Sequence, residues 1–297
     1  MSAILPCPPM MVTRMVSTLH TARLARVQTS THDLTIGERE VRKEFVAGHE
    51  AQAEREWTCL TLLAEHAPGL APRPLRREDG DRPVVVMSRV PGQPVAPRPM
   101  TAGETAALGA ALRRLYDVPV EAVTAAGIGP RRYGADALAG VLVAWLADEP
   151  DLDQCHDPAL VADALALARA YVAAPPLPEP RLTALGIADL NPANVLLHDG
   201  EVRLVDFEDG GLSDPAYELA DHVEHLGSRL PGVYDVDALP AAVGLDAGDR
   251  ARMAAYRPLF AAFWLAMLLP GNGSWRRNPR GTTEAQAAHF MALARHH

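Results

Sequence analysis

The run RVPGQPVAPRPM at residues 89–100 divides the chain into two parts with different residue patterns. Five prolines or glycines within ten residues interrupt helices and strands alike. Residues 31–88 contain strand-like alternation and one helical pattern, whereas residues 101–297 are rich in Ala and Leu at helical spacing. The sequence therefore predicts an α+β protein: an extension at 1–30, a small β-rich N-terminal lobe, a hinge at 89–100 and a larger helical lobe.

Helical spacing recurs along the chain. The first such pattern runs from about Glu50 to His66. Thr101, followed three positions later by Glu104, forms a capping box that predicts a helix to about Tyr116. Further helices are expected near residues 136–148, 158–173, 213–229, 247–269 and 282–296. The segments 67–75 and 174–181 contain several prolines and are predicted to be connections.

Composition excludes several classes of partner. The net charge is -9, with 37 acidic and 28 basic residues, so the chain lacks the basic surface that binds nucleic acid or anionic lipid. An acidic balance of this size fits an ordinary solvated surface or a cationic or metal-bridged ligand. The most apolar run, residues 259–269, is too short to span a bilayer, and the opening residues do not resemble a secretory signal.

The cysteines indicate a reducing compartment. Cys7, Cys59 and Cys155 are odd in number, far apart and without a CxxC pair, so neither a disulfide framework nor a zinc site is indicated. We therefore expect a cytoplasmic protein. The oligomeric state has no sequence signal.

A single lysine stands among 27 arginines. Alternation in GEREVRKEFV places Lys43 on the covered face of a strand with Val41 and Phe45. In the following helix, Glu56 lies on the same face as Leu60, so each buried charge offers the other a partner. The alternatives are that Lys43 survives by chance and that Glu56 reaches to water at the edge of the core.

Polar residues also interrupt the apolar run LGIADLNPANVLL. Asp189 and Asn194 lie five residues apart in this loop, and a short hairpin with Asp-Gly at its tip follows. The hairpin is expected to bring Asp206 back beside Asn194. Two carboxylates and an amide oxygen are the ligands that Mg²⁺ prefers. The alternative is that Asp189, Asn191 and Asn194 only cap backbone groups of a turn.

These segments resemble a known family. DLNPANVLL followed by VRLVDFEDGGLSDPAYELA is similar to the catalytic and metal-binding segments of the aminoglycoside phosphotransferase and choline kinase family. The resemblance takes in EVRKEF, AEREWTCLTLL and PVVVMSRVPG, and it covers residues 31–227 in order. It implies a bilobal, protein-kinase-like α+β fold and a phosphotransferase that uses ATP and Mg²⁺ and acts on a hydroxyl of a small molecule.

The resemblance also implies a role for each matching residue. Asp189 would orient the attacking hydroxyl and accept its proton, and Asn194 and Asp206 would bind the magnesium ion. Lys43 would contact the α- and β-phosphates and be held in place by Glu56. The remaining nucleotide contacts are expected from the hinge and the catalytic loop, at Met87, Ser88, Val90 and Asn191.

The sequence departs from the family pattern in places. Ile187 stands where the family has a His, which favours as an alternative a nucleotide-binding pseudokinase or scaffold without turnover. No GxGxxG lies near residues 31–37, so the residues that cover the phosphates are unassigned. Asn191 stands where protein kinases have Lys, which argues against a protein substrate.

The acceptor is only loosely constrained. Acidic residues crowd the segment after the metal-binding hairpin and would suit a cationic acceptor such as an aminoglycoside or choline; they are Glu208, Asp209, Asp214, Glu218, Asp221 and Glu224. For Asp214 and Glu218 the alternative is a structural role at the start of the next helix. His222 and His225 lie close to Asp221, but no further zinc ligands accompany them.

Overall fold

The computed structural model describes residues 25–28 and 32–295, which form two compact units. One unit holds the described residues up to 132 together with 180–250, and the other holds 133–179 and the residues from 251 onward. Most of the predicted extension at 1–30, including Cys7, lies outside the described residues. All the residues that the sequence analysis assigned to a site belong to the first unit.

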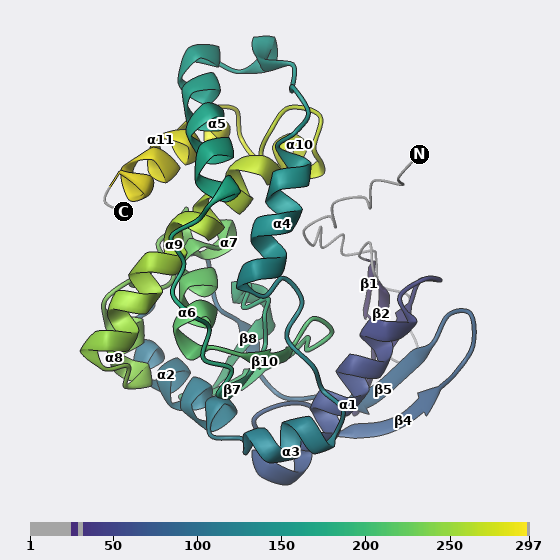
Figure 1. Cartoon of the computed structure of the whole chain (residues 1–297). Coiled ribbons are helices and arrows are strands. Elements are labelled where there is room, and N and C mark those ends of the chain that lie inside the picture. Colours follow the sequence, from purple (N-terminus) through teal and green to yellow (C-terminus); the bar gives the residue numbers. More distant parts are fainter. Residues whose placement is uncertain (1–24, 29–31, 296–297) are drawn as a thin grey trace. The chain divides into compact units, whose positions relative to one another are not determined.

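A five-stranded antiparallel sheet forms the N-terminal part of the first unit, in the order β1-β2-β3-β5-β4 (Figure 1). Its strands are β1 (Ala25–Gln28), β2 (His32–Ile36), β3 (Glu40–Phe45), β4 (Pro74–Glu78) and β5 (Val84–Ser88). The alternation predicted for β3 holds in its second half, where Lys43 and Phe45 are buried while Glu44 between them is partly exposed, whereas Val41 is only partly buried. β5 is apolar and buried almost throughout, and helix α1 (Glu50–His66) packs against it.

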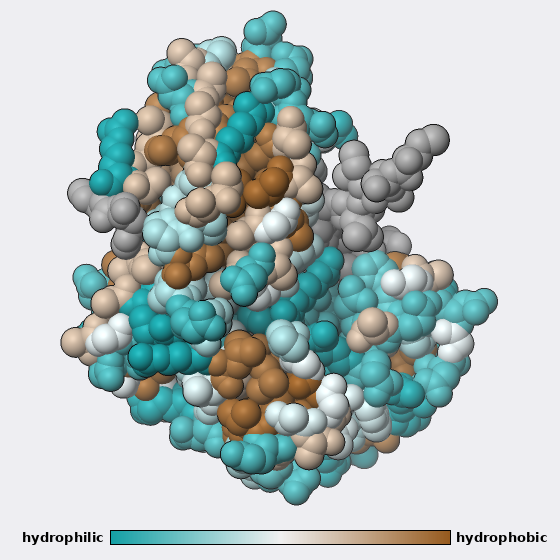
Figure 2. Space-filling view, in the orientation of Figure 1, coloured by the Kyte–Doolittle hydropathy of each residue, from teal (hydrophilic) through white to brown (hydrophobic). Residues whose placement is uncertain are grey.

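The connection predicted at residues 67–75 ends earlier than expected. β4 begins at Pro74, so the last two residues of that segment belong to the sheet. Proline is tolerated there because it is the first residue of an edge strand. The outward side chains of β4 include Arg76 and Glu78, and Figure 2 shows a mainly hydrophilic surface over β4 and β5.

Helix α1 (Glu50–His66) has the bounds that its residue spacing predicted, and it packs against β3, β4 and β5. The residues on its buried face include Ala53, Glu56, Leu60 and Leu63, which recur at intervals of three and four. Glu56 is 1% exposed, whereas Glu54 faces solvent. The helix therefore carries one carboxylate into the core beneath the sheet.

The rest of the first unit consists of short helices and two small sheets. Helix α2 (Ala102–Tyr116) begins with the predicted capping box, in which the Thr101 hydroxyl accepts the Glu104 N–H at 3.2 Å. The predicted hairpin is present as β8 (Val195–His198) and β9 (Glu201–Leu204), with β6 (Gln93–Pro94) beside β8. The other elements are α3 (Val120–Ala125), β7 (Ala184–Gly186), η2 (Pro192–Asn194), β10 (Gly211–Ser213), α6 (Pro215–Glu224), α7 (Leu226–Arg229) and α8 (Ala238–Val243).

The single helix predicted at residues 213–229 is wrong, because two helices meet at His225. The Asp214 carboxylate accepts the Ala216 N–H and starts α6 at Pro215. His225 adopts φ -55° and ψ 127°, which ends α6, and its carbonyl and ring nitrogen then accept the first N–H groups of α7. A side chain that caps the next helix thus divides an otherwise helical run.

The second unit is entirely helical within the described residues. Its elements are α4 (Ala135–Trp145), η1 (Leu152–Gln154), α5 (Pro158–Ala173), most of α9 (Ala247–Met267), α10 (Gly273–Arg277) and α11 (Thr282–Ala294). These bounds agree with the predicted helices to within a few residues, and α10 was not predicted. Tyr171 of α5 and Phe290 of α11 meet edge to face with ring centroids 6.0 Å apart.

Two further features concern membrane spans and cysteines. No helix of the described part of the chain is long and apolar enough to cross a bilayer. Cys59 and Cys155 are free thiols, and Cys59 is buried.

Candidate active site

Lys43 contacts three carboxylates. Its Nζ lies 3.2 Å from Glu56 Oε2, 2.5 Å from Asp206 Oδ1 and 2.9 Å from Glu208 Oε2. The pair that the sequence predicted between Lys43 and Glu56 is therefore present. Burial alone would lower the pKa of Lys43, but the charges of these carboxylates outweigh it and hold the pKa well above its ordinary value. The lysine is a fixed positive charge in the interior of the first unit.

Glu208 is a member of this cluster that the sequence analysis did not assign to it. Its Oε2 also lies 3.1 Å from Nδ1 of His32, which is 2% exposed. Although burial would raise the pKa of Glu208, Lys43 and His32 hold it well below its usual range. The available sequence signal was the spacing of two residues between Asp206 and Glu208. Burial raises the pKa of Glu56 above its usual range, so this carboxyl group is only partly charged near neutral pH, and the other two carboxylates account for the excess negative charge around the ammonium.

The polar residues of the loop at 185–197 lie next to the end of the hairpin, as the sequence predicted. The Asn194 side chain donates from Nδ2 to the Asp189 carbonyl at 3.0 Å, and the Asn194 carbonyl accepts the Val205 N–H at 3.0 Å. That second bond places Asp206 next to Asn194, which is 2% exposed. Asp206 adopts φ 76°, a left-handed conformation that directs the chain out of β9.

Turn chemistry is present in the same loop. The Asp189 carboxylate accepts the Asn191 N–H at 3.1 Å, and the Asn191 side chain accepts the Ala193 N–H at 3.0 Å. The turn interpretation and the site interpretation are thus compatible for Asp189. The carbonyl oxygen of the Asn191 amide accepts one hydrogen bond within the turn, and its NH₂ group is available to a ligand.

The Asp189 side chain is 52% exposed, whereas its neighbours Ala188 and Leu190 are buried. Desolvation by the surrounding loop, and then repulsion from Asp206, Asp221 and Asp209, raise the pKa of Asp189 above its ordinary value. Because half of the side chain is open to water, solvent offsets part of that rise. The site therefore presents one accessible carboxylate of increased basicity.

A buried ion pair between Arg131 and Glu218 stabilises the loop that contains Asp189. Glu218 Oε2 accepts the N–H of Ala188, whose φ of 69° is left-handed, and Glu218 Oε1 lies 2.7 Å from Arg131 Nη1. Arg131 also donates to Asp221 at 2.6 Å. A Cβ atom at Gly186 would overlap the Glu218 carboxyl group, so only glycine fits there. Glu218 is thus structural, as one of the two alternatives held, but it stabilises the preceding loop rather than the start of α6, which Asp214 caps.

Removing Arg131 is expected to destabilise the protein. The Arg131→Met variant leaves two carboxylates without their buried partner, which costs about 3–5 kcal/mol of unfolding free energy. The matched control is Arg132→Met, because Arg132 pairs with Asp209 at a partly exposed position where such pairs contribute about 0–1 kcal/mol. Urea unfolding of both variants measures the difference, and equal losses would contradict a special role for Arg131.

The three residues predicted to contact adenine, two at the end of β5 and Val90 in the segment 89–100, differ in what their backbone can offer. The Ser88 N–H donates to the Arg73 carbonyl at 2.8 Å, and its hydroxyl accepts the Arg73 N–H at 2.9 Å. Met87 is buried at 5% exposure and pairs with Val41 in the sheet. Val90 has no backbone hydrogen bond within residues 25–28 and 32–295. Of the three predicted hinge contacts, Val90 is the one with unused backbone groups.

The acidic residues after the hairpin are mostly committed to contacts within the chain; they are Glu208, Asp209, Asp214, Glu218, Asp221 and Glu224. Arg131 pairs with two of them, and Arg132 and Lys43 pair with one each. Asp214 caps α6, and Glu224 is fully buried. These contacts account for the acidic cluster without an acceptor, so the cluster does not indicate the charge of the acceptor.

Within the described residues, His222 and His225 do not form a metal site together. Both ring nitrogens of His222 are buried without a hydrogen-bond partner among the described residues, and burial lowers its pKa to about 3. The Nδ1 atom of His225 instead accepts the Gly227 N–H at 3.0 Å. In the described part of the chain, no group of three or more His, Cys, Asp or Glu side chains is arranged to hold a metal ion.

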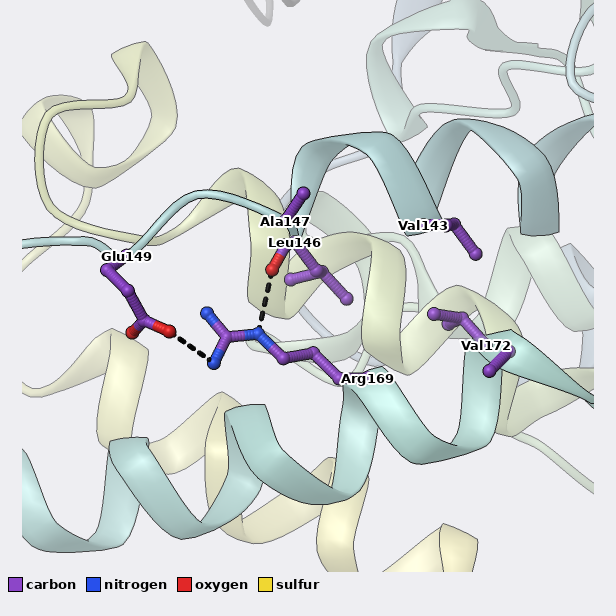
Figure 3. Close-up of a pocket in the computed structure, with 7 residues that line it drawn as sticks. Val143, Leu146, Ala147, Glu149, Arg169 and Val172 are labelled. Carbon is purple, nitrogen blue, oxygen red and sulfur yellow. Dashed lines mark hydrogen bonds and ion pairs between the residues drawn. The ribbon is translucent and has the colours of Figure 1, made fainter.

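A shallow hollow in the second unit has a structural explanation (Figure 3). Val143 and Val172 line its apolar side. The Arg169 guanidinium in it donates to the Leu146 carbonyl at 2.7 Å and lies 2.8 Å from Glu149. Arg169 thus satisfies a carbonyl at the C-terminal end of α4, and the hollow contains no group suited to catalysis.

The chain is similar to known proteins both in sequence and in fold. The sequence model of the phosphotransferase enzyme family matches residues 26–256. No curated protein sequence matches the chain.

Solved structures with a similar fold include proteins named as kinases or phosphotransferases. A choline/ethanolamine kinase family protein from Mesorhizobium loti has 20% identity and a TM-score of 0.61, with 92% of this chain and 88% of that one covered. The GDP complex of aminoglycoside 2'-phosphotransferase-IIIa has 16% identity, a TM-score of 0.60 and 93% coverage of both chains. Spectinomycin phosphotransferase with ADP and spectinomycin has 11% identity, a TM-score of 0.56, and 96% and 91% coverage. The protein-kinase-like α+β fold expected from the sequence is confirmed.

Proposed function

We propose, from the premise that this chain belongs to the phosphotransferase enzyme family, that it transfers the γ-phosphoryl group of ATP to a hydroxyl group of a small molecule. The observation that carries this proposal is the meeting, within one compact unit, of an accessible carboxylate, a buried lysine and an oxygen-rich hairpin end. Asp189, Lys43, Asn194 and Asp206 supply these groups from three separate segments.

Asp189 acts as the general base. The acceptor oxygen attacks the γ-phosphorus, the bond from that phosphorus to the β,γ-bridging oxygen breaks, and ADP leaves with the electron pair. The proton of the acceptor hydroxyl passes to the Asp189 carboxylate. Its half-exposed position gives an acceptor access, and its raised pKa makes it a better base than an ordinary aspartate.

Lys43 binds the α- and β-phosphates of the nucleotide. Its ammonium is held by Glu56 and Glu208, which leaves Asp206 as the partner that a phosphate would compete with. A compact ammonium fits between three carboxylates where a planar guanidinium does not. This constraint accounts for one lysine in a chain whose other basic residues are arginine.

The residues present fit a magnesium ion. Asp206 supplies a carboxylate oxygen. The NH₂ group of Asn194 donates to the Asp189 carbonyl, so the amide oxygen of Asn194 is directed away from that carbonyl. Two hard oxygen ligands next to excess negative charge are what Mg²⁺ uses when water and phosphate oxygens complete its shell. When bound, the ion neutralises charge on the phosphates of ATP. Only two protein side chains supply ligands in this proposal, so no cluster of three or more acidic side chains is expected at this site.

The adenine ring lies along the hinge in this proposal. Val90 offers unused backbone groups, and Met87 offers an apolar side chain at the end of β5. Ser88 is the weakest of the three predicted contacts because its N–H and hydroxyl already bond to Arg73. The NH₂ group of Asn191 is available as a donor to a nucleotide. We place the reaction in the cytoplasm, in line with the free thiols of Cys59 and Cys155.

Calorimetric titration with ATP tests the proposed site. We expect binding that requires magnesium, followed by acceptor-dependent ADP release when amino alcohols, sugars and aminoglycosides are supplied. No nucleotide binding with or without magnesium would contradict the proposal. The acceptor in this proposal is a small molecule; its charge is left to the screen.

A nucleotide-binding scaffold without turnover is the second candidate, and Ile187 favours it. Ile187 is fully buried directly after β7, so no donor reaches the loop from the position where the family has a His. If Ile187 only fills space, the Ile187→His variant should keep its turnover and lose about 1–3 kcal/mol of stability from the buried ring. Turnover that appears only in Ile187→His would support the scaffold.

A further inference from the structure

We propose that His225 is the positioning residue for Asp189, and that it supplies from the start of α7 the donor that Ile187 lacks. The inference rests on the proposed function, because it concerns the carboxylate assigned there as the base. Nε2 of His225 lies 3.5 Å from Oδ1 of Asp189, although the two residues are 36 positions apart.

The tautomer of His225 follows from its other nitrogen. Nδ1 accepts the Gly227 N–H at 3.0 Å, so Nδ1 carries no hydrogen. A neutral imidazole then carries its hydrogen on Nε2, which is the atom facing Asp189. Burial lowers the pKa of His225 to about 4, which keeps the ring neutral near pH 7. Asp189 Oδ1 therefore lies 3.5 Å from a nitrogen that carries a hydrogen.

Hydrogen bonds fix the backbone of His225, and close packing restricts its ring. The His225 N–H donates to the Asp221 carbonyl at 2.8 Å, and its own carbonyl accepts the N–H groups of Ser228 and Arg229. The imidazole is 5% exposed and lies so close to Gly227 that a Cβ there would sit 3.1 Å from Nδ1. The same Cβ would lie 3.5 Å from Cδ of Pro192 in the catalytic loop. His225 is thus fixed beside the loop that it orients.

The two carboxylate oxygens of Asp189 have different roles in this proposal. Oδ1 of Asp189 faces His225 Nε2 and accepts the Asn191 N–H at 3.1 Å. Oδ2 is left to accept the proton of the acceptor hydroxyl. A separation of 3.5 Å is long for a hydrogen bond, and catalytic contacts of this kind shorten when substrate is bound. A half-exposed carboxylate without this donor samples other rotamers, and misplacement by about 1 Å costs up to about 10²-fold in rate.

Three variants separate positioning from capping. His225→Gln keeps a donor at the place of Nε2, His225→Asn keeps only an acceptor at the place of Nδ1, and His225→Leu keeps neither. We expect kcat to fall by about 10–10²-fold in the Asn and Leu variants and to be largely retained in Gln, with KM for ATP unchanged in all three. Thermal melting checks that each variant is folded.

A purely structural role predicts the opposite order, because the Asn variant alone keeps the cap on Gly227. Activity in His225→Asn equal to or above that of His225→Gln would overturn the proposal. So would a His225→Leu variant that is folded and has full kcat.

Imidazole nitrogen NMR tests the inference without turnover, and so separates it from the proposed function. We expect the Nε2–H tautomer for His225, assigned by its loss in His225→Gln, and a shift of the Nε2 signal in Asp189→Ala. The control Asp199→Ala, at the exposed hairpin tip, should leave the signal in place. An Nδ1–H tautomer, or no response to Asp189→Ala, overturns the inference even if the enzyme turns over. Failure of turnover with the expected spectrum overturns only the proposed function.

Discussion

Replacing Asp189 by Asn is expected to lower kcat by about 10²–10⁴-fold, the contribution of a positioned general base. The amide keeps the size of the carboxylate and an oxygen for the Asn191 N–H, but it cannot accept the proton of the acceptor hydroxyl. Because Asp189 contacts neither Lys43 nor the hinge, affinity for magnesium-ATP should be largely retained. Steady-state ADP release and calorimetric titration measure the two quantities.

Asp199→Asn is the matched control for this change. Asp199 is also an exposed loop aspartate, with 88% of its side chain open to solvent, but it lies at the tip of the hairpin between β8 and β9. Its φ of 50° is a conformation that Asn tolerates, so the control should be folded and fully active. Full activity in Asp189→Asn, or an equal loss in both variants, would remove Asp189 from its assigned role.

Replacing Asp206 by Asn is expected to weaken the magnesium-dependent part of nucleotide binding and to lower kcat by about 10²–10³-fold. The substitution removes one negative charge and leaves a single neutral oxygen as ligand, and metal-ion stabilisation of phosphoryl transfer amounts to several kcal/mol. The fold should persist, because Asn also tolerates φ 76° and Lys43 keeps Glu56 and Glu208 as partners.

Thermal shift with ATP, in the presence and absence of magnesium chloride, provides a readout besides activity. Wild type should gain stability from ATP mainly when magnesium is present, since a ligand stabilises in proportion to its binding. The magnesium-dependent gain should be small in Asp206→Asn and intact in Asp199→Asn, which also changes an aspartate of positive φ. An undiminished gain in Asp206→Asn would show that this residue does not bind the ion.

Local patterns predicted the parts of the site that depend on spacing. Alternation in β3 put Lys43 on the covered face, helical spacing put Glu56 there as well, and the Asp-Gly turn returned Asp206 to Asn194. Each of these inferences needs only one period or one turn type, and such signals are strong over short distances. The capping box of α2 and most helix bounds were predictable for the same reason.

The missed contacts depend on long-range packing. Arg131 and Glu218 are 87 residues apart, and His225 and Asp189 are 36 apart, so no local period connects them. His225 was further hidden because its capping role splits a run that otherwise has helical spacing. The sequence also did not predict that several of the acidic residues pair with arginines, because their charges alone resemble a binding surface.

The most direct test of the central claim is ADP release by the wild-type protein across a panel of hydroxyl acceptors, with and without magnesium. We expect release that requires both magnesium and one class of acceptor, and that is absent in Asp189→Asn while Asp199→Asn retains it. Binding of magnesium-ATP without turnover on any acceptor of the panel would contradict the claim and identify the chain as a nucleotide-binding scaffold.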